Sequence, residues 1–318
     1  MTEFTVFTPT YNRAHTLPRV YECLINQSYT NFIWLIIDDG STDKTKELVD
    51  TWINKGILEI KYIYKPNGGK HTAMELAYKS VTTKYIITLD SDDTLLPNAI
   101  ETFHFNWKLV EEQELDNEIA EIRAFSKDDI TGNPVGGNLS MFLKDDKYID
   151  TTWQEWVLKF RHTHEMTMAQ NTIKLNECVD FERYRLYSDK IKYIGERVFW
   201  SAIGRKYKTR YIRYIARIYH QDAGESLLRP RIEDKKFFYA HWVVSFYITN
   251  ENIAYFWYNP LIFIKNILIY SISGFFLNIT FIKQIKVITN RLFCNLYIIL
   301  YPISYLIYLY KKYLKGLN

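Results

Sequence analysis

Cysteine is scarce in this sequence, and the three that occur, Cys23, Cys178 and Cys294, lie far apart along the chain. An odd number of widely spaced thiols forms neither a disulfide framework nor paired metal ligands, which favours a reducing, cytosolic setting. Glycine and proline are also few, at 12 and 8 of 318 residues, so a collagen-like or linker-like chain is excluded. The first residues lack a basic segment followed by an apolar one, and we therefore expect no export signal.

Acidic residues are absent after Glu251, whereas seven basic residues follow it: Lys265, Lys283, Lys286, Arg291, Lys311, Lys312 and Lys315. Removing this charge of +7 from the net charge of +4 leaves the first 251 residues at −3. A nucleic-acid-binding protein usually carries its positive charge on the folded domain, so we expect no nucleic-acid partner. The change of character towards the C-terminus predicts a first folded domain over 1–230 and a helical, basic and aromatic region over 231–318.

Short β-rich runs alternate with helical patterns from Glu3 to about Asn98, which is typical of βαβ units and a largely parallel sheet. The strands are expected at 4–8, 32–37, 57–64 and 84–90, and the helices at 16–27, 43–54 and 71–81. Beyond them the sequence predicts a helix over 97–115, a strand over 118–126 and a loop over 131–137. In open α/β sheets ligands bind outside the carboxyl ends of the strands, so the candidate site residues should lie there.

Two uncharged runs occupy the C-terminal region, at 266–282 and 292–310. The second run, at 19 residues, is long enough to be considered as a membrane span. A span is disfavoured by charge, because a cytoplasmic domain and a basic C-terminus on the same side require an even number of crossings, which would place Lys283, Lys286 and Arg291 outside. Helices lying in the membrane interface fit better. A buried helical core of a soluble protein is the remaining alternative.

Three polar motifs follow predicted strands in order: Thr8-Pro9-Thr10-Tyr11-Asn12-Arg13, Asp38-Asp39-Gly40-Ser41-Thr42-Asp43 and Asp90-Ser91-Asp92-Asp93. Each alone is common in turns and helix caps. Together, in this order, they resemble the family 2 inverting glycosyltransferases with the GT-A fold, over roughly residues 3–227. The resemblance implies a Rossmann-like mixed α/β sheet flanked by helices, and an enzyme of the bacterial surface-polysaccharide type.

Aspartate oxygens suit Mn²⁺ or Mg²⁺, which bind substrate phosphates through one or two carboxylates and keep several waters. The cluster of Asp90, Asp92 and Asp93 can provide such ligands. The resemblance assigns Asp39 to the nucleotide base, Asp90 to the ribose and Asp92 to the metal, with Asp93 as a further ligand. It also implies donor-binding roles for other residues of the motifs: Thr8, Pro9, Thr10, Tyr11, Arg13 and Ser91.

The loop Pro66-Asn67-Gly68-Gly69-Lys70-His71 precedes the third predicted helix. Its two glycines allow close backbone approach, and the helix N-terminus favours anions. Relatives carry a similar glycine-containing loop near the nucleotide, so Gly69 and Lys70 are candidates for donor binding. A plain loop with a solvated lysine is the alternative reading.

The resemblance places an acidic residue before an apolar helix, and Glu196 matches it as the candidate general base, with Asp189 as the fallback. A glutamate stabilised by a helix N-terminus is the structural alternative. His220 is a possible metal ligand, because some GT-A enzymes use a late histidine. His164 and Glu165 are candidates for acceptor contact. Zinc fits poorly, because no cysteine or third close histidine completes a site.

A dense basic stretch remains that these roles do not explain: Arg205, Lys206, Lys208, Arg210, Arg213 and Arg217. Two interpretations stay open for it, a solvated charged face and an anion-facing surface.

The sequence therefore predicts transfer of a sugar from a nucleotide-diphosphate donor, most simply a UDP-sugar, to a hydroxyl of a saccharide acceptor. The basic, aromatic C-terminal region favours a polyprenyl-diphosphate-linked acceptor met at the inner face of the cell membrane. A nucleotidyltransferase would need a glycine-rich basic loop after the first strand, where this chain has Thr8 to Arg13. A membrane-bound protein that binds sugar nucleotides without catalysis is the other alternative.

Overall fold

The computed structural model describes residues 2–140, 142, 147–185, 194–222 and 235–314. The chain divides into two compact units, each described here by itself. The first, which we call the sheet unit, contains Met1–Trp153, His162–Asp180 and Ile203–Gly224. The second, the helical unit, contains Gln154–Arg161, Phe181–Ala202 and Glu225–Asn318.

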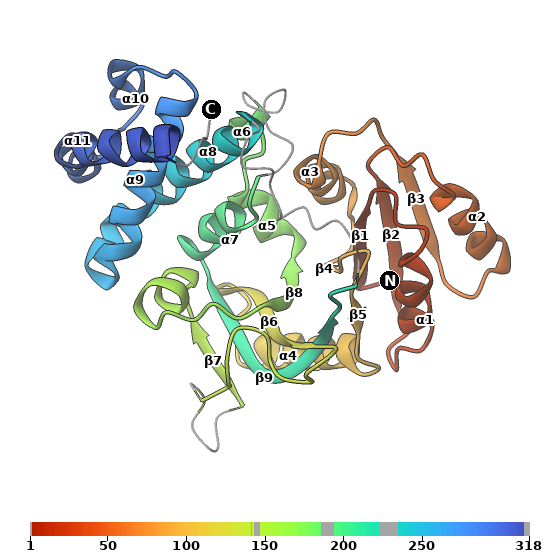
Figure 1. Cartoon of the computed structure of the whole chain (residues 1–318). Helices are drawn as coiled ribbons and strands as arrows, with labels where there is room; N and C mark the ends of the chain where they lie inside the picture. The colour runs from red at the N-terminus through yellow and green to blue at the C-terminus, as the bar shows by residue number, and fades with distance from the viewer. Residues whose placement is uncertain (1, 141, 143–146, 186–193, 223–234, 315–318) are drawn as a thin grey trace. The chain divides into compact units, whose positions relative to one another are not determined.

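The first half of the sheet unit alternates strands and helices as predicted (Figure 1). Its strands β1, β2 and β3 and the following β4 pair in parallel in the order β3-β2-β1-β4. The elements of this half are β1 (Phe4–Thr10), α1 (Leu17–Ile25), β2 (Phe32–Asp38), α2 (Thr45–Lys55), β3 (Ile60–Tyr64), α3 (Lys70–Ser80) and β4 (Tyr85–Thr88).

The second half makes the sheet mixed. Strand β8 pairs antiparallel with both β4 and β6, and β9 runs parallel to β6 and antiparallel to β5 and β7. The elements are β5 (Thr94–Leu95), α4 (Ala99–Glu112), β6 (Ile119–Asp128), β7 (Tyr148–Thr151), β8 (Met166–Asn171), α5 (Thr172–Cys178) and β9 (Lys208–Tyr219). The expected mixed α/β sheet with flanking helices is confirmed.

Apolar side chains on both faces of the parallel strands explain why helices cover both sides. Helices α1, α2 and α4 share one core with alternate strand residues such as Val6 and Trp34. Helix α3 packs against β1 and β2 with its own buried residues, among them Met74 and Tyr78, and lies across the sheet from α2 in Figure 1. Part of the aromatic content packs within this sheet unit, where Tyr21 stacks on Trp52 with ring centroids 4.6 Å apart.

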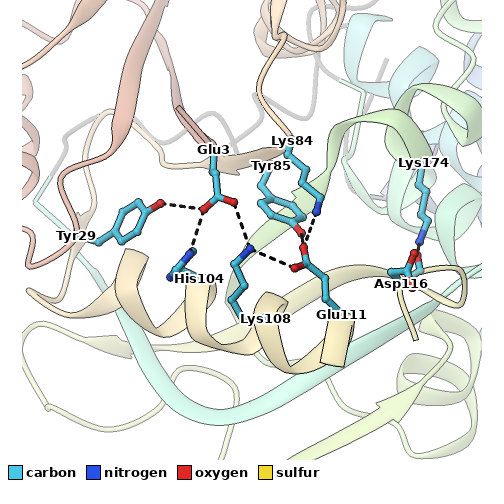
Figure 2. Close-up of polar contacts among 9 residues, drawn as sticks. All are labelled: Glu3, Tyr29, Lys84, Tyr85, His104, Lys108, Glu111, Asp116 and Lys174. Atoms are coloured by element: carbon cyan, nitrogen blue, oxygen red, sulfur yellow. Dashed lines mark hydrogen bonds and ion pairs between the residues drawn. The ribbon is translucent and has the colours of Figure 1, made fainter. Parts of the chain in front are cut away.

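A polar network closes the amino ends of the parallel strands, at the edge opposite the predicted site (Figure 2). Glu3, just before β1, accepts a hydrogen bond from the Tyr29 hydroxyl at 3.1 Å, and His104 Nε2 lies 3.1 Å from the same carboxylate oxygen. Lys108 of α4 bridges Glu3 at 3.4 Å and Glu111 at 3.1 Å. These contacts fasten α4 to the strand starts.

The helical unit is built around α9, which packs against both α8 and α11. Its elements are a π-helical turn (Glu155–Lys159), α6 (Glu182–Arg185), most of α7 (Arg197–Gly204), α8 (Lys235–Asn252), a 3₁₀ turn (Ile253–Tyr258), α9 (Pro260–Phe276), α10 (Phe281–Lys286) and α11 (Arg291–Leu314). Within the described residues one helical segment, Arg291–Tyr313, is long and apolar enough to cross a membrane, with a mean hydropathy of 1.7. Only 17% of its most apolar window is buried, so most of this window is at least partly exposed in the helical unit.

Candidate functional site

The carboxyl ends of the first three strands meet in one row, because the register pairs Thr10 with Asp38 and Asp38 with Tyr64. Asp38 is fully buried at this edge. Its carboxylate accepts hydrogen bonds from the Ser41 backbone at 2.7 Å and from the Tyr62 hydroxyl at 2.6 Å. Burial and the Asp38 charge both raise the pKa of Tyr62, which keeps this phenol a hydrogen-bond donor. Asp38 therefore stabilises the turn that positions the next residue, Asp39.

Asn12 ties the first loop to the second, a role that the sequence analysis did not assign. Its backbone N–H donates to Ser41 Oγ at 2.8 Å, and its side-chain Oδ1 accepts from the Thr42 backbone at 2.8 Å. Asn12 also has a positive φ of 53°, which asparagine adopts more readily than most residues. In the sequence, only the position of Asn12 within the first motif indicates such a role.

Asp39 is only 4% exposed and is held by the loop before α3. Its carboxylate accepts hydrogen bonds from the backbone N–H groups of Gly68 at 2.9 Å and Gly69 at 2.7 Å. Lys65 forms an ion pair with it, and Asn67 donates to its carbonyl at 2.8 Å. The second motif and the glycine loop thus form one preorganised unit at the sheet edge.

The third motif forms a carboxylate cluster just beyond β4. One oxygen from each of Asp90, Asp92 and Asp93 lies within 4.8 Å of the others. Lys70, the first residue of α3, lies 2.6 Å from Asp90, and Arg13 lies 3.8 Å from Asp92. The structure therefore brings together predicted residues from three separate loops.

The carboxylates of this cluster differ in their affinity for protons. Burial and the neighbouring Asp90 charge raise the pKa of Asp92. Burial, with the charges of Asp90 and Asp92, raises the pKa of Asp93 to about 7 despite the opposing Arg217. Although burial raises it, the charges of Lys70 and Arg217 hold the pKa of Asp90 below its ordinary value. Crowded carboxylates of this kind are stabilised by a cation, and three oxygen donors suit Mn²⁺ or Mg²⁺.

His220 closes one side of the cluster. Its backbone N–H donates to Asp93 at 3.1 Å. Its two ring nitrogens lie 3.0 Å from Thr94 Oγ1 and 3.1 Å from Asp129 Oδ2. Because both nitrogens have protein partners, metal ligation by His220 requires that one of them be released.

Arg217 of β9 is a site residue for which the sequence had offered two readings. Its guanidinium lies 3.2 Å from Asp93, 2.8 Å from Ser126 Oγ and 3.4 Å from Glu165. It is 7% exposed in its side chain, so the contact with Asp93 is buried. Arg217 thereby supports the third motif from β9, which pairs with β5 immediately after the motif.

The rest of the basic stretch divides between buried and exposed pairs. Arg210 is fully buried and makes two hydrogen bonds to Asp150, at 2.9 and 2.7 Å. Lys206 is exposed and pairs with Glu177. The basic stretch is therefore neither entirely a solvated charged face nor entirely an anion-facing surface.

The two candidate acceptor residues lie where β8 begins. His164 packs edge-on against the Phe125 ring at 5.2 Å, and its Nε2 lies 3.1 Å from the Asn138 carbonyl. Glu165 is about half exposed, and its contact with Arg217 links it to the Asp93 side of the site. Their role in acceptor binding stays a prediction.

The donor-binding candidates of the first motif differ in accessibility. Thr8 is fully buried, and its Oγ1 accepts a hydrogen bond from Trp34 Nε1 at 2.9 Å. Pro9 and Thr10 complete the strand, whereas Tyr11 is 47% exposed immediately beyond it. Among these, Tyr11 is the one whose side chain is open to a ligand.

Gly69 and Ser91, the two other small donor-binding candidates, take part in the structure of the site through their backbones. Gly69 caps α3 with a φ of 93°, in the region that favours glycine. Ser91 is 7% exposed, and its carbonyl accepts a hydrogen bond from Thr16 Oγ1 at 2.8 Å.

Glu196 lies in the helical unit, immediately before α7. Its carbonyl accepts hydrogen bonds from the backbones of Phe199 at 2.9 Å and Trp200 at 3.1 Å, which is the position of a helix start. The fallback candidate, Asp189, lies outside the described residues. The assignment of the general base stays a prediction.

Comparison with known proteins gives matches that agree with this arrangement. The family model described as glycosyl transferase family 2 matches residues 5–223. An uncharacterized glycosyltransferase of Rickettsia felis is 42% identical over 100 residues, which are 31% of this chain and 16% of that protein. Chondroitin synthase of Pasteurella multocida is 34% identical over 96 residues, which are 30% of this chain and 10% of the synthase. The matched segment is thus a small part of these relatives.

Two solved structures share the fold at low sequence identity. S. aureus TarS in complex with UDP-GlcNAc has a TM-score of 0.61 and 17% identity, covering 99% of this chain and 93% of that one. The mannosyltransferase PcManGT from Pyrobaculum calidifontis, in complex with GDP-Man and Mn²⁺, has a TM-score of 0.51 and 13% identity, covering 94% and 87%. The sheet is accordingly GT-A-like. Since the family model covers well over half of the sequence, this chain belongs to glycosyl transferase family 2.

Proposed function

We propose that this protein is a metal-dependent inverting glycosyltransferase that moves a sugar from a nucleotide-diphosphate donor to a hydroxyl of a saccharide acceptor. The observation that carries the proposal is the cluster of Asp90, Asp92 and Asp93 beside Lys70 and Arg13. It combines oxygen ligands for a cation with positive charge for a diphosphate, at the ligand-binding edge of the sheet. The likeness to TarS, solved with UDP-GlcNAc, supports a UDP-sugar donor of the hexosyl or N-acetylhexosaminyl type.

The donor roles follow from the two preorganised loops. Asp39, fixed by the Gly68 and Gly69 backbones, is our candidate to receive hydrogen bonds from the nucleotide base. Asp90 would receive them from the ribose. Lys70, which neutralises Asp90 at 2.6 Å, would instead face the diphosphate once a donor competes for it.

Asp92, with Asp93, would hold the cation. Bound there, Mn²⁺ or Mg²⁺ supplies positive charge that offsets the charge developing on the departing diphosphate. Burial raises the pKa of Asp93 to about 7, so a cation that binds there near neutral pH would displace a proton from this carboxyl.

Glu196 is our proposed general base, which would take the proton from the acceptor hydroxyl as its oxygen attacks the anomeric carbon. A single displacement of this kind inverts the configuration of that carbon. General base catalysis contributes about 10²–10⁴-fold to the rate. His164 and Glu165 are our candidates for acceptor contact.

We propose a cytoplasmic location at the inner face of the cell membrane and a polyprenyl-diphosphate-linked acceptor in surface polysaccharide synthesis. The support is the absence of acidic residues after Glu251 together with the apolar helix Arg291–Tyr313. Such a region favours a membrane surface with anionic lipids.

A panel of sugar nucleotides, with Mn²⁺ and candidate saccharide acceptors, tests the proposed reaction by mass spectrometry of the products. The Asp92→Ala and Glu196→Gln variants should each lose at least about 10²-fold in turnover. Asp50→Ala, a change at a partly exposed residue of α2, is the matched control and should keep full turnover. Full turnover in either site variant rejects that residue's role. Donor binding without turnover, with acceptor supplied, would instead support the alternative of a non-catalytic binding protein.

A further inference from the structure

The outer face of α11 is an apolar strip that the described residues leave uncovered. Its members are spaced three, four or, in one case, seven positions apart along the helix and are between 38% and 72% exposed. They are Leu292, Ile299, Ile303, Leu306, Tyr310 and Tyr313. We call this set the α11 strip. Spacing of this kind places the side chains on one side of a helix.

The opposite face of α11 is already occupied. Phe293, Tyr297 and Ser304 are fully buried. Tyr270 of α9 contacts the rings of Phe293 at 5.9 Å and Tyr297 at 5.7 Å, and further along Phe276 contacts Tyr308 at 4.9 Å. The helix is therefore fastened to α9 along its length, and the α11 strip is the face that remains for a partner.

Both ends of the strip carry positive charge. Arg291 begins α11, and Lys311 and Lys312 lie in its last turns. No acidic residue follows Glu251 anywhere in the sequence, so nothing within this region neutralises them. A second copy of the chain would bring the same positive ends against these, in either orientation of the pair, and is disfavoured by charge.

An anionic bilayer surface fits both the apolar strip and the positive ends. A 24-residue helix is about 36 Å long, so the two ends are far apart. A spanning helix would place one positive end on the outer side of the membrane, whereas a helix lying flat places both among headgroups of one leaflet. We infer that α11 lies in the plane of an anionic membrane surface, with the α11 strip facing the lipid.

This inference refines the membrane location in the proposed function by naming the contact face and its orientation. Its test uses the full-length protein and vesicles without any sugar nucleotide. Transfer to a soluble saccharide acceptor is assayed separately, so that failure of vesicle binding and failure of catalysis can be told apart.

Flotation with vesicles of phosphatidylcholine, with and without phosphatidylglycerol, measures the binding. The wild-type protein should float with the mixed vesicles, less at high salt, and should be released by alkaline carbonate. The double variant Ile299→Glu, Leu306→Glu should bind at least about 100-fold more weakly, because each charge would enter the lipid interface. The control Ile173→Glu makes the same change at a residue of α5 that is 79% exposed, and should bind like the wild type.

Lys311→Gln, Lys312→Gln provides a second variant at the helix end, where the fold is little affected. We expect it to bind mixed vesicles about tenfold or more weakly and neutral vesicles unchanged. Circular dichroism melting verifies that each variant is folded. Wild-type binding by the folded strip variant, or resistance of the wild type to carbonate, overturns the inference. So does a vesicle-free dimer that the strip variant converts to a monomer, because the strip would then join two copies of the chain.

Discussion

Lys70 Nζ lies 2.6 Å from Asp90 Oδ1, so the first residue of α3 and the loop after β4 neutralise each other at one edge of the sheet. Both side chains are substantially buried, at 17% and 33% exposed. Burial strengthens the attraction between two opposite charges. An incoming diphosphate is also negatively charged. It can therefore take the place of Asp90 and form a Lys70–phosphate contact.

Replacing Lys70 by methionine should weaken binding of UDP with Mn²⁺ by about 10- to 100-fold, because a charged hydrogen bond contributes about 1.5–3 kcal/mol. Isothermal titration calorimetry measures the change. Lys79→Met removes another α3 lysine, which pairs with Glu75 and is 53% exposed, and should leave UDP affinity unchanged. If Lys70→Met bound UDP with wild-type affinity, Lys70 would have no role in diphosphate binding and would serve only in its ion pair with Asp90.

Gly40 adjoins the loop that holds Asp39, and a side chain there is excluded for two reasons. Its φ is +89°, and an added Cβ would lie 2.8 Å from the Asn67 backbone nitrogen. Gly40→Ala should therefore cost about 1–3 kcal/mol of unfolding free energy in backbone strain, and more from displacement of Asn67. We also expect weaker UDP binding, because Asn67 donates to the Asp39 carbonyl.

Gly56→Ala is the matched control for Gly40→Ala. Gly56 also has a positive φ, of +63°, but an added Cβ would meet nothing within 4 Å. Urea unfolding should show a loss of about 1–2 kcal/mol for the left-handed conformation, with unchanged UDP binding. Equal losses of stability and of UDP affinity in the two variants would contradict a special role for the Gly40–Asn67 contact.

The alternation of strands and helices was predictable because each element buries a regular apolar face. Strands β1 and β2 are short runs that are buried at every position, as parallel strands covered on both faces are, and Val20 and Leu24 follow the spacing of a helix. The pairing of β9 with both β6 and β5 was not predictable, because these partners are distant in sequence and their apolar patterns fit several registers.

The candidate site was predictable only where its residues follow consecutive strands. Parallel strands end at the same edge of a sheet, so Asp39 and Asp90 could be placed together from their positions in sequence. Arg217 could not, because it reaches Asp93 through β9, more than a hundred residues later. Asn12 was missed because its contribution is a backbone bend and two loop contacts rather than a recognisable chemical group.

Glu111 stabilises the amino edge of the sheet through the contacts drawn in Figure 2. Although partial burial raises it, hydrogen bonds from Lys84, Lys108 and Tyr85 lower the pKa of Glu111 from 4.5 to about 2. Its contribution is therefore complete above pH 4.5 and is lost as the pH falls towards 2. Glu111→Gln should lose about 1–2 kcal/mol at pH 7, since solvent screens a side chain that is 30% exposed.

Urea unfolding at pH 7 and at about pH 3 measures this difference, which should shrink at the lower pH. Glu112→Gln changes the next residue, which is exposed, and should have little effect. Neither variant should change UDP binding, because this network lies at the opposite edge from the candidate site. A Glu111→Gln protein with a constant deficit at both pH values would contradict the assigned contacts.

His71 is a buried histidine in the first turn of α3, and it should make the protein sensitive to mild acid. It is 5% exposed, and neither ring nitrogen has a hydrogen-bond partner among the described residues. Burial lowers the pKa of His71 from 6.5 to about 4, with partial compensation from the Asp39 charge. The unfolded chain therefore binds a proton that the folded protein does not, between these two pH values.

Stability should consequently fall as the pH drops from 6.5 to about 4, by roughly 3 kcal/mol from this residue alone. His71→Gln cannot titrate, so its unfolding free energy should decline less over the same range, even if its stability at pH 7 is lower. Urea unfolding at a series of pH values measures the two slopes. His15→Gln, a change at an exposed histidine, should retain the wild-type slope. Parallel slopes for the wild type and His71→Gln would mean that the imidazole is already hydrated or hydrogen-bonded in solution.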